Sequence, residues 1–401
     1  MSNMDIKRND NTDVRFRFRH IFYYIFLLLC MFPFLFGNPF FETDMQPYAL
    51  VLAVILCLFN VTKSVNHGRF RTYFLISLFT LFIALLIVLL DGISLSSLRG
   101  FYNYCAIFFI PWAISITFYT VGGFPERFIK LCIIIWFSVS LVQFFVDRSF
   151  AVSLVGTVRW QDMSRGVVGL ASEPSYLGIA CFYFLLMTKF FTKKKWLFVV
   201  MIVIMGVLFA QSSLGIVFIG VYWLFFLMDN MRSRKGWIIL IISIAMFFGF
   251  IFLLETRFTN TRMSTILTGF INEGIAGVED DSSIDTRYNS IVDAMQDAFG
   301  NYLIPIGFRE RIGSAYGGFL CELGIFAVPL LFCISRFASF TFSRAFVRVL
   351  FFIAFTVLMF NNTQLGNPLL LFAIVSNCCF SIPIGYTQIE YNSFGFGRQN
   401  K

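Results

Sequence analysis

The sequence predicts an all-helical membrane protein with about twelve transmembrane segments, and three features support this fold class. Hydrophobic residues make up 58% of the 401 residues, and charged residues make up only 13%. Soluble domains carry roughly a quarter charged residues. The hydrophobic residues form blocks of about 15 to 22 residues with almost no charge inside, the length that crosses about 30 Å of hydrocarbon. Short polar segments rich in Lys and Arg separate these blocks.

The transmembrane segments are expected to be helices, because backbone groups in a bilayer must find hydrogen-bond partners within their own segment. The expected ranges are 20–37, 46–62, 73–90, 101–121, 128–146, 170–190, 196–211, 214–229, 237–254, 314–335, 345–361 and 366–384. Only Gln211-Ser212-Ser213 separates the seventh segment from the eighth, and we expect a tight hairpin there. The first segment follows a polar, Arg-containing start without a small-residue cleavage site, which indicates a retained helix.

The distribution of Lys and Arg predicts the orientation. These residues concentrate in alternate connections, and the positive-inside rule then places both termini in the cytoplasm. Every lysine falls on the expected cytoplasmic side, whereas every basic residue expected outside is an arginine. Either external loops simply tolerate charge, or these guanidinium groups bind phosphate in a bidentate manner, which an ammonium group does not do.

Several other classes of function are not expected. The net charge of +9 is explained by the topology and does not indicate nucleic-acid binding. All nine cysteines lie in hydrophobic blocks, so no disulfide framework or zinc spacing is present. The two histidines, His20 and His67, are both expected in the cytoplasm, which leaves no external histidine base or histidine metal site. No P-loop sequence is present, and we expect no cofactor and no metal.

Two external loops are longer than a simple connection requires, namely 147–169 and 255–313. Long loops in a compact fold are usually functional. The second loop contains Ser282–Phe299, in which apolar residues recur at helical spacing. We expect an amphipathic periplasmic helix there, which lies on the membrane or covers a cavity.

The first candidate site is the stretch from Arg165 to Gly178, where the loop 147–169 enters the sixth helix. Pro174 suits the first helical turn, with Ser172 or Glu173 as the cap. The free N–H groups of such a helix start attract an anion. Glu173 is an ionisable residue near the lipid interface and is therefore a functional candidate, although it can also simply pair with Arg165.

The second candidate site lies in the late loop and at the start of the tenth helix. Arg287, Arg309 and Arg311 precede the stretch from Gly313 to Gly324, which contains Tyr316 and Glu322. Counted along a single helix, Glu322 is expected roughly 13 Å below the helix start. The alternative for Glu322 is a structural hydrogen bond between helices.

These two stretches resemble the motifs of the Wzy-type O-antigen polymerases and, more distantly, of the O-antigen ligases. The resemblance rests on Ser172-Glu173-Pro174-Ser175, on Glu322-Leu323-Gly324, and on the arginines of the late loop. Ligases of this superfamily have a histidine at the start of the tenth-helix motif, where this chain has Gly313-Ser314, which favours a polymerase.

The resemblance implies a GT-C-like glycosyltransferase of the bacterial inner membrane. Its substrate would be an oligosaccharide repeat unit linked to undecaprenyl diphosphate, and a chain-length regulator would be a possible protein partner. Glu173 and Arg287 are the expected catalytic residues. The expected substrate-binding residues are Arg159, Arg165, Ser172, Ser175, Tyr176, Arg309, Arg311, Tyr316 and Glu322.

Other functions remain open at this point. An O-antigen ligase or an exopolysaccharide polymerase belongs to the same enzyme class. A flippase for lipid-linked saccharides would have charged residues within several helices and some two-fold sequence symmetry. A non-enzymatic assembly factor would not depend on any single external arginine.

Overall fold

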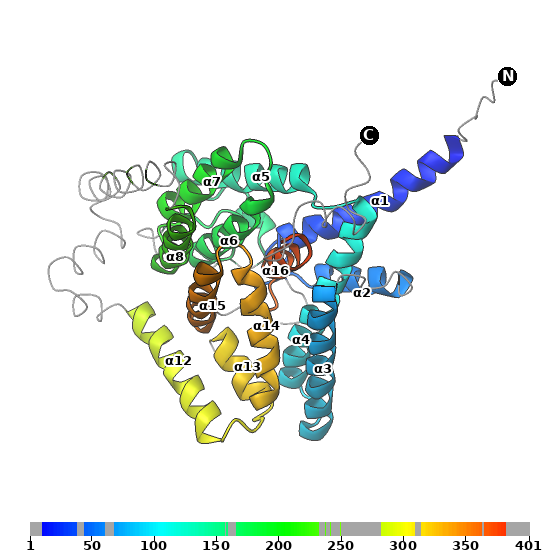
Figure 1. Cartoon of the computed structure of the whole chain (residues 1–401), viewed down its shortest axis with the longest axis vertical. Helices are drawn as coiled ribbons and strands as arrows, with labels where there is room; N and C mark the ends of the chain where they lie inside the picture. The colour runs from blue at the N-terminus through cyan, green and yellow to red at the C-terminus, as the bar shows by residue number, and fades with distance from the viewer. Residues whose placement is uncertain are drawn as a thin grey trace.

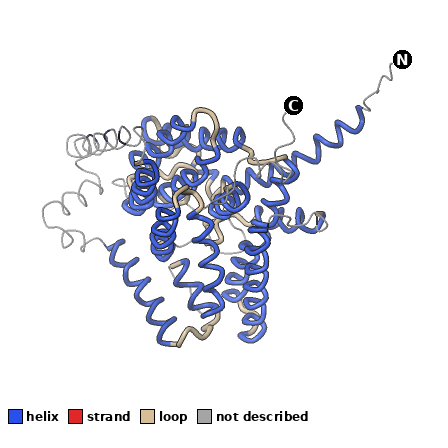
Figure 2. The backbone as a smooth tube through the Cα atoms, viewed as in Figure 1, coloured by secondary structure: helices blue, strands red, loops and turns tan. Residues whose placement is uncertain are grey.

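The computed structural model describes residues 10–37, 44–60, 68–156, 166–231, 282–308, 314–362 and 365–381, together with a few isolated positions. The described chain is helical, and its only strand-like pairing is an isolated bridge between Leu35 and Val155 (Figure 2). The expected helix 237–254 falls almost wholly outside the described residues, and so does 255–281.

Helices occupy the described hydrophobic segments (Figure 1). The α-helices are α1 (Asp10–Met31), α2 (Tyr48–Phe59), α3 (Gly68–Asp91), α4 (Leu95–Val121), α5 (Glu126–Phe145), α6 (Pro174–Met187), α7 (Lys195–Ile204), α8 (Ser213–Asn230), α12 (Ser282–Gly300), α13 (Ala315–Leu323), α14 (Val328–Ser339), α15 (Ala345–Phe360) and α16 (Pro368–Phe380). Three short 3-10 helices are η1 (Val152–Leu154), η2 (Thr188–Phe190) and η4 (Gly324–Ala327), and η3 (Met205–Phe209) is a π-helical turn.

Within the described residues, five helical stretches are long and apolar enough to cross a membrane. By length and composition they are Arg69–Asp91, Leu95–Val121, Glu126–Phe145, Ser213–Asn230 and Ala315–Ser339, the last of which is interrupted at Gly324. Several shorter apolar helices accompany them, and many large apolar side chains on α3 and α15 are exposed. Such exposure is unfavourable in water and favourable in lipid, so this is a helical, membrane-embedded protein.

Helices α6 and α16 form the centre of the bundle (Figure 1). Every residue of α6 is buried, and so is every residue of α16 from Pro368 to Cys379. Helix α6 packs against α8 and α16, and α16 also packs against α4 and α14. A helix that is hydrophobic on all sides belongs in the interior of the protein, because it has no polar face to place elsewhere.

A close glycine contact joins α6 to α8. A Cβ atom added to Gly178 would lie 2.5 Å from the Cα atom of Gly215, and one added to Gly215 would lie 2.7 Å from the Cα atom of Gly178. Small residues at a helix crossing let two backbones approach closely, which favours van der Waals packing within a membrane. This contact fixes the position of α6 within the bundle.

The segment expected as one helix over 314–335 is two helices that fold back on each other. Helix α13 ends at Leu323, and Gly324 follows with φ +57° and ψ −137°. The hydroxyl group of Tyr316 lies 2.8 Å from that of Ser335, whereas a continuous helix would separate these residues by roughly 28 Å. The turn is held by a hydrogen bond of 2.8 Å from the Ile325 N–H to the Leu303 carbonyl. Residues 315–339 therefore form a helical hairpin.

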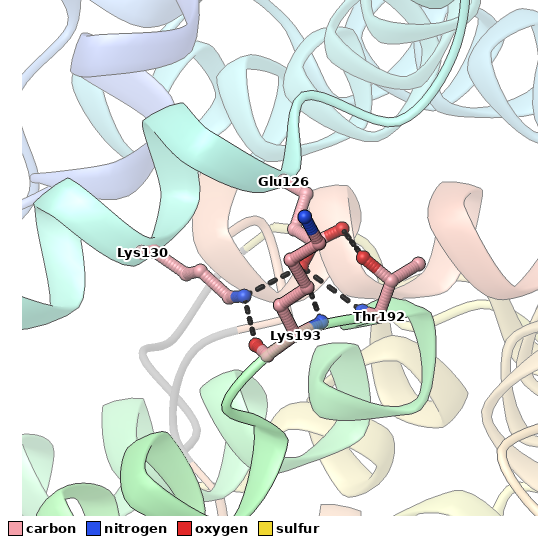
Figure 3. Close-up of polar contacts among 4 residues, drawn as sticks. All are labelled: Glu126, Lys130, Thr192 and Lys193. Atoms are coloured by element: carbon pink, nitrogen blue, oxygen red, sulfur yellow. Dashed lines mark hydrogen bonds and ion pairs between the residues drawn. The ribbon is translucent and has the colours of Figure 1, made fainter.

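Hydrogen bonds gather alternate connections at one end of the bundle, which we call the basic end. The Glu126 carboxylate at the start of α5 accepts hydrogen bonds from Lys130, Thr192 and Lys193, so it ties α5 to the α6–α7 connection (Figure 3). At the same end, Lys189 Nζ donates to the Phe340 carbonyl at 2.6 Å. Lys130, Lys189 and Lys193 thus lie at this end of the bundle.

Three other connections, namely α1–α2, α5–α6 and α7–α8, meet near the start of α6. The Phe36 N–H donates to the Leu154 carbonyl at 2.9 Å, which joins the α1–α2 connection to the α5–α6 connection. The Val167 N–H donates to the Phe209 carbonyl at 2.8 Å, which adds the α7–α8 turn. Helix α6 begins among these segments, and we call this region the α6 entrance.

Candidate functional site

The α6 entrance contains the first motif singled out in the sequence. Glu173 is the N-cap residue with φ −145° and ψ 156°, and Pro174 is the first helical residue. The Glu173 carbonyl accepts hydrogen bonds from the N–H groups of Tyr176 and Leu177, both at 3.1 Å. The Glu173 side chain is half-buried, and its Oε2 accepts a hydrogen bond of 3.0 Å from Ser175 Oγ. The carboxylate thus lies at the positive end of a buried helix.

The adjacent Ser172 side chain is fully buried. Its exposed fraction is 0%, and its Oγ has no hydrogen-bond partner among the residues that the structure describes. A buried hydroxyl group without a partner costs free energy, and most such groups in folded proteins are satisfied. Ser172 therefore offers a donor and an acceptor immediately before the start of α6.

The end of α5 holds the chain that leads into α6. Gln143 Oε1 accepts a hydrogen bond of 2.7 Å from the Gly169 N–H, and Gln143 Nε2 donates to the Gly169 carbonyl at 2.9 Å. Gly169 has φ +61°, a left-handed conformation that glycine adopts without steric cost. Arg148 Nη2 donates to the Gly166 carbonyl at 2.9 Å. These contacts position the backbone just before Ser172.

The α1–α2 connection contacts α6 through Tyr176. The rings of Phe34 and Tyr176 are stacked, with centroids 5.7 Å apart and an interplanar angle of 5°. Gly37 and Gly156 lie in close backbone contact, since a Cβ atom added to Gly37 would be 2.9 Å from the Gly156 Cα atom. Tyr176 is buried by this arrangement, so its ring supports the α6 entrance and offers little surface for a sugar.

The start of α13 is joined to α6 through Asn362, which lies between α15 and α16. The Ala315 N–H donates to the Asn362 carbonyl at 2.6 Å, and Asn362 Nδ2 donates to the Tyr183 hydroxyl at 2.5 Å. Ser314 is the N-cap residue of α13, and its hydroxyl accepts a hydrogen bond of 3.0 Å from the Gly317 N–H. Asn362 therefore links the start of α13 to the C-terminal half of α6.

Tyr316 lies in the core of the α13–α14 hairpin. Its side chain has an exposed fraction of 0%, and its hydroxyl group contacts Ser335 Oγ and the Leu331 carbonyl. The expected contact of Tyr316 with a sugar would require the hairpin to open. In the described conformation, Tyr316 stabilises the hairpin.

Glu322 lies at the opposite end of α13 from Tyr316. Its Oε2 accepts a hydrogen bond of 2.6 Å from the Tyr104 hydroxyl of α4. The positive charge of Arg99 also acts on this carboxylate. The rings of Phe308 and Phe319 pack against Tyr104, at centroid distances of 5.8 and 4.9 Å. Glu322 thus forms the helix-to-helix hydrogen bond that was the structural alternative, and it lies in the last turn of α13, just before the turn at Gly324.

The amphipathic segment of the late loop is the helix α12, which packs against α13 (Figure 1). Ala294 and Ala298 of α12 are buried, and Cys321 Sγ lies 3.2 Å from the Ala294 carbonyl. Arg287 lies on this helix, and its side chain is outside the described residues. Helix α12 therefore covers the hairpin near Glu322.

The structure brings some predicted site residues together and separates others. Ser172, Glu173, Ser175 and Tyr176 form one continuous cluster at the α6 entrance. Arg159, Arg165, Arg309 and Arg311 lie outside the described residues.

Sequence reasoning missed Tyr104, Gln143, Tyr183 and Asn362, which hold these clusters in place. Their partners are up to 218 residues away in the sequence, and no local pattern indicates such pairs. Over the ranges that the structure describes, no group of three or more His, Cys, Asp or Glu side chains is arranged to hold a metal ion.

We compared the chain with protein-family models, with curated proteins and with solved structures. No family model, no curated protein and no solved structure matches it.

Proposed function

We propose that this protein is an O-antigen polymerase, a glycosyltransferase that joins oligosaccharide repeat units linked to undecaprenyl diphosphate. The proposal includes a bacterial inner-membrane location, about twelve spans in a GT-C-like arrangement, and cytoplasmic termini. It rests on the motif resemblance of Arg165–Gly178 and Gly313–Gly324, and it is supported by the helical membrane fold.

One observation carries the proposal, namely the chemistry of the α6 entrance. There a half-buried carboxylate, Glu173, stands at the N-terminus of a fully buried helix, beside the unpartnered hydroxyl of Ser172. A glycosyl transfer of this kind needs a base for the acceptor hydroxyl and a positive environment for the departing diphosphate. The Glu173 carboxylate supplies the first, and the positive end of the α6 dipole contributes to the second.

In the proposed reaction, an acceptor hydroxyl of one repeat unit attacks the anomeric carbon of the donor glycan. Glu173 takes the hydroxyl proton while the bond between the anomeric carbon and the diphosphate oxygen breaks. Undecaprenyl diphosphate leaves with the bonding electron pair, and arginines of the two external loops stabilise its charge. Arg159, Arg165, Arg287, Arg309 and Arg311 are the residues proposed for this role. Cleavage of the sugar–diphosphate bond drives the transfer, so no nucleotide is needed.

The experiment is complementation of a host in which the corresponding gene is deleted. Lipopolysaccharide from the deletion strain should carry a single repeat unit, and the wild-type chain should restore a ladder of longer polymers. The variants Glu173→Gln and Arg309→Lys should both shorten the ladder at normal expression, since lysine lacks the bidentate fork. Asp147→Asn is the matched control, because Asp147 begins the same external loop and its carboxylate accepts hydrogen bonds from its neighbour Ser149.

A bare lipopolysaccharide core in the deletion strain would instead identify a ligase, and trapped cytoplasmic intermediates would identify a flippase. Full ladders from both Glu173→Gln and Arg309→Lys would contradict the proposed chemistry.

A further inference from the structure

A cavity of about 510 Å³ lies at the basic end, between α3, α14 and α15. The surface of this cavity is almost entirely apolar, and three arginines, Arg69, Arg336 and Arg348, are among the residues that border it. The remaining lining residues are Phe332, Ser339, Phe340, Ala345, Val349 and Phe352. No acidic side chain lines this cavity.

Two of the arginines are held in place around one aromatic ring. The guanidinium carbons of Arg69 and Arg348 lie 5.2 and 5.4 Å from the centroid of the Phe340 ring. Arg69 Nη1 donates to the Ser381 carbonyl at 2.7 Å, and Arg348 Nε donates to the Phe342 carbonyl at 2.6 Å. Each guanidinium has five N–H donors, so several donors remain for a ligand.

Asp229 acts electrostatically on Arg348, but the described carboxylates form no ion pair with the three arginines. No Asp or Glu side chain in the described part of the chain lies within 4.0 Å of any of the three guanidinium groups. Lys189 adds a further positive charge, because its Nζ bonds the Phe340 carbonyl and the Ser381 hydroxyl. Asp229 also lies at this end, and its carboxylate accepts hydrogen bonds from the N–H groups of Ser343 and Arg344 at 3.0 and 2.9 Å.

The apolar side chains that line the cavity continue onto the outer surface of the protein. Phe332 and Val349 are 53% and 60% exposed, and the neighbouring Phe346 and Ile353 of α15 are exposed as well. In a membrane-embedded protein such a surface contacts hydrocarbon chains. An occupant that matches this cavity has an anionic group beside the arginines and an apolar chain along the apolar side chains.

We propose that this cavity binds an anionic glycerophospholipid, with its phosphodiester between the three guanidinium groups and an acyl chain along Phe332, Val349 and Phe352. Basic pockets between transmembrane helices bind the headgroups of anionic lipids, and the arginine fork matches the phosphate oxygens. The site is distinct from the α6 entrance, because Lys189 and Glu173 lie at opposite ends of the buried helix α6. The inference is therefore independent of the proposed enzymatic function.

The test measures lipid binding to the full chain, purified in detergent and freed of lipid. Dioleoyl phosphatidylglycerol and dioleoyl phosphatidylcholine are added separately, and bound lipid is counted by native mass spectrometry. Phosphatidylglycerol should bind more tightly than phosphatidylcholine. Arg336→Gln should weaken phosphatidylglycerol binding about fivefold, which corresponds to the contribution of one basic residue to the binding of anionic lipid. The Arg336 side chain is exposed, and among the described residues only its backbone carbonyl takes part in a side-chain hydrogen bond, from Ser339, so this variant should fold normally.

Arg71→Gln is the matched control. Arg71 lies on α3 close to Arg69, is exposed, and does not line the cavity, so its loss should leave lipid binding unchanged. Millimolar inorganic phosphate should not displace the bound lipid, since it lacks an acyl chain. The proposal is overturned if the two lipids bind equally, if both variants weaken binding equally, or if inorganic phosphate displaces the lipid.

Discussion

Glu173 and Glu322 are the two carboxylates of the motifs singled out in the sequence, and their surroundings differ. Glu173 is the cap of a buried helix and bonds the flexible hydroxyl of its neighbour Ser175. Glu322 receives a hydrogen bond of 2.6 Å from Tyr104, a residue of another helix. The first carboxylate has local partners at a helix start, whereas the second joins α13 to α4. The proposed function assigns a chemical role to Glu173, whereas the bond with Tyr104 gives Glu322 a positioning role.

The largest expected effect belongs to Glu173→Gln. Loss of a general base lowers a rate by about 100-fold or more. Glutamine keeps the size of the side chain and its bond with Ser175, so the fold should be retained. The measurement is the rate at which the full chain in lipid vesicles elongates a lipid-linked repeat unit, with Asp147→Asn as the control. An unchanged elongation rate would show that Glu173 has no chemical role. The two carboxylates would then not differ in the way proposed.

A smaller effect is expected at Glu322, and it should appear in stability. Glu322→Ala leaves the buried Tyr104 hydroxyl without its acceptor, which costs about 1–3 kcal/mol of unfolding free energy. The double variant Glu322→Ala with Tyr104→Phe should recover part of this loss, because both polar partners are then absent. The unfolding free energies of the single and the double variant are measured on the detergent-solubilised chain. A stable but inactive Glu322→Gln variant would show that Glu322 belongs to the reaction itself.

The comparison also assumes that α6 is held firmly by its neighbours, and Gly178→Ala tests this. The added methyl group would push against the Gly215 backbone, and overpacking of this kind costs about 1–3 kcal/mol. The control is Gly220→Ala in α8, where an added Cβ meets nothing within 4 Å. Equal unfolding transitions for the two variants would show that the close contact does not determine the position of α6.

The smallest effect on folding is expected from Ser172→Ala. Because the Ser172 hydroxyl is buried without a partner among the described residues, its removal should not lower the unfolding transition. If the hydroxyl contacts the substrate, the KM for the lipid-linked repeat unit should rise about fivefold, as for one lost hydrogen bond. An unchanged KM would show that the Ser172 hydroxyl does not bind the substrate, so the chemistry proposed for the α6 entrance would then rest on Glu173.

The start of α6 was predictable because its chemistry is local. Proline at the first helical position and a polar residue before it define a helix start within three or four residues. The α12 helix was predictable for a similar reason, since its apolar residues recur with helical spacing. Which surface α12 covers was not predictable, because the burial of Ala294 and Ala298 depends on α13.

The α13–α14 hairpin was not predictable from hydrophobicity. The segment 314–335 has the composition of a single transmembrane helix, and glycine within such a segment does not by itself indicate a break. The break depends on Leu303, whose carbonyl accepts the Ile325 N–H. This turn brings α14 back along α13 and buries Tyr316 within the hairpin.

The sequence by itself determined that this chain forms apolar helices in a membrane, because hydrophobicity, helix caps and the alternation of basic segments act over short distances. Only the tertiary structure decided which helices are central, where Glu322 finds its partner, and that three arginines from α3, α14 and α15 surround one cavity. The physical reason is that these features depend on contacts between residues far apart in the chain, and each such contact is selected by packing and hydrogen bonding in three dimensions.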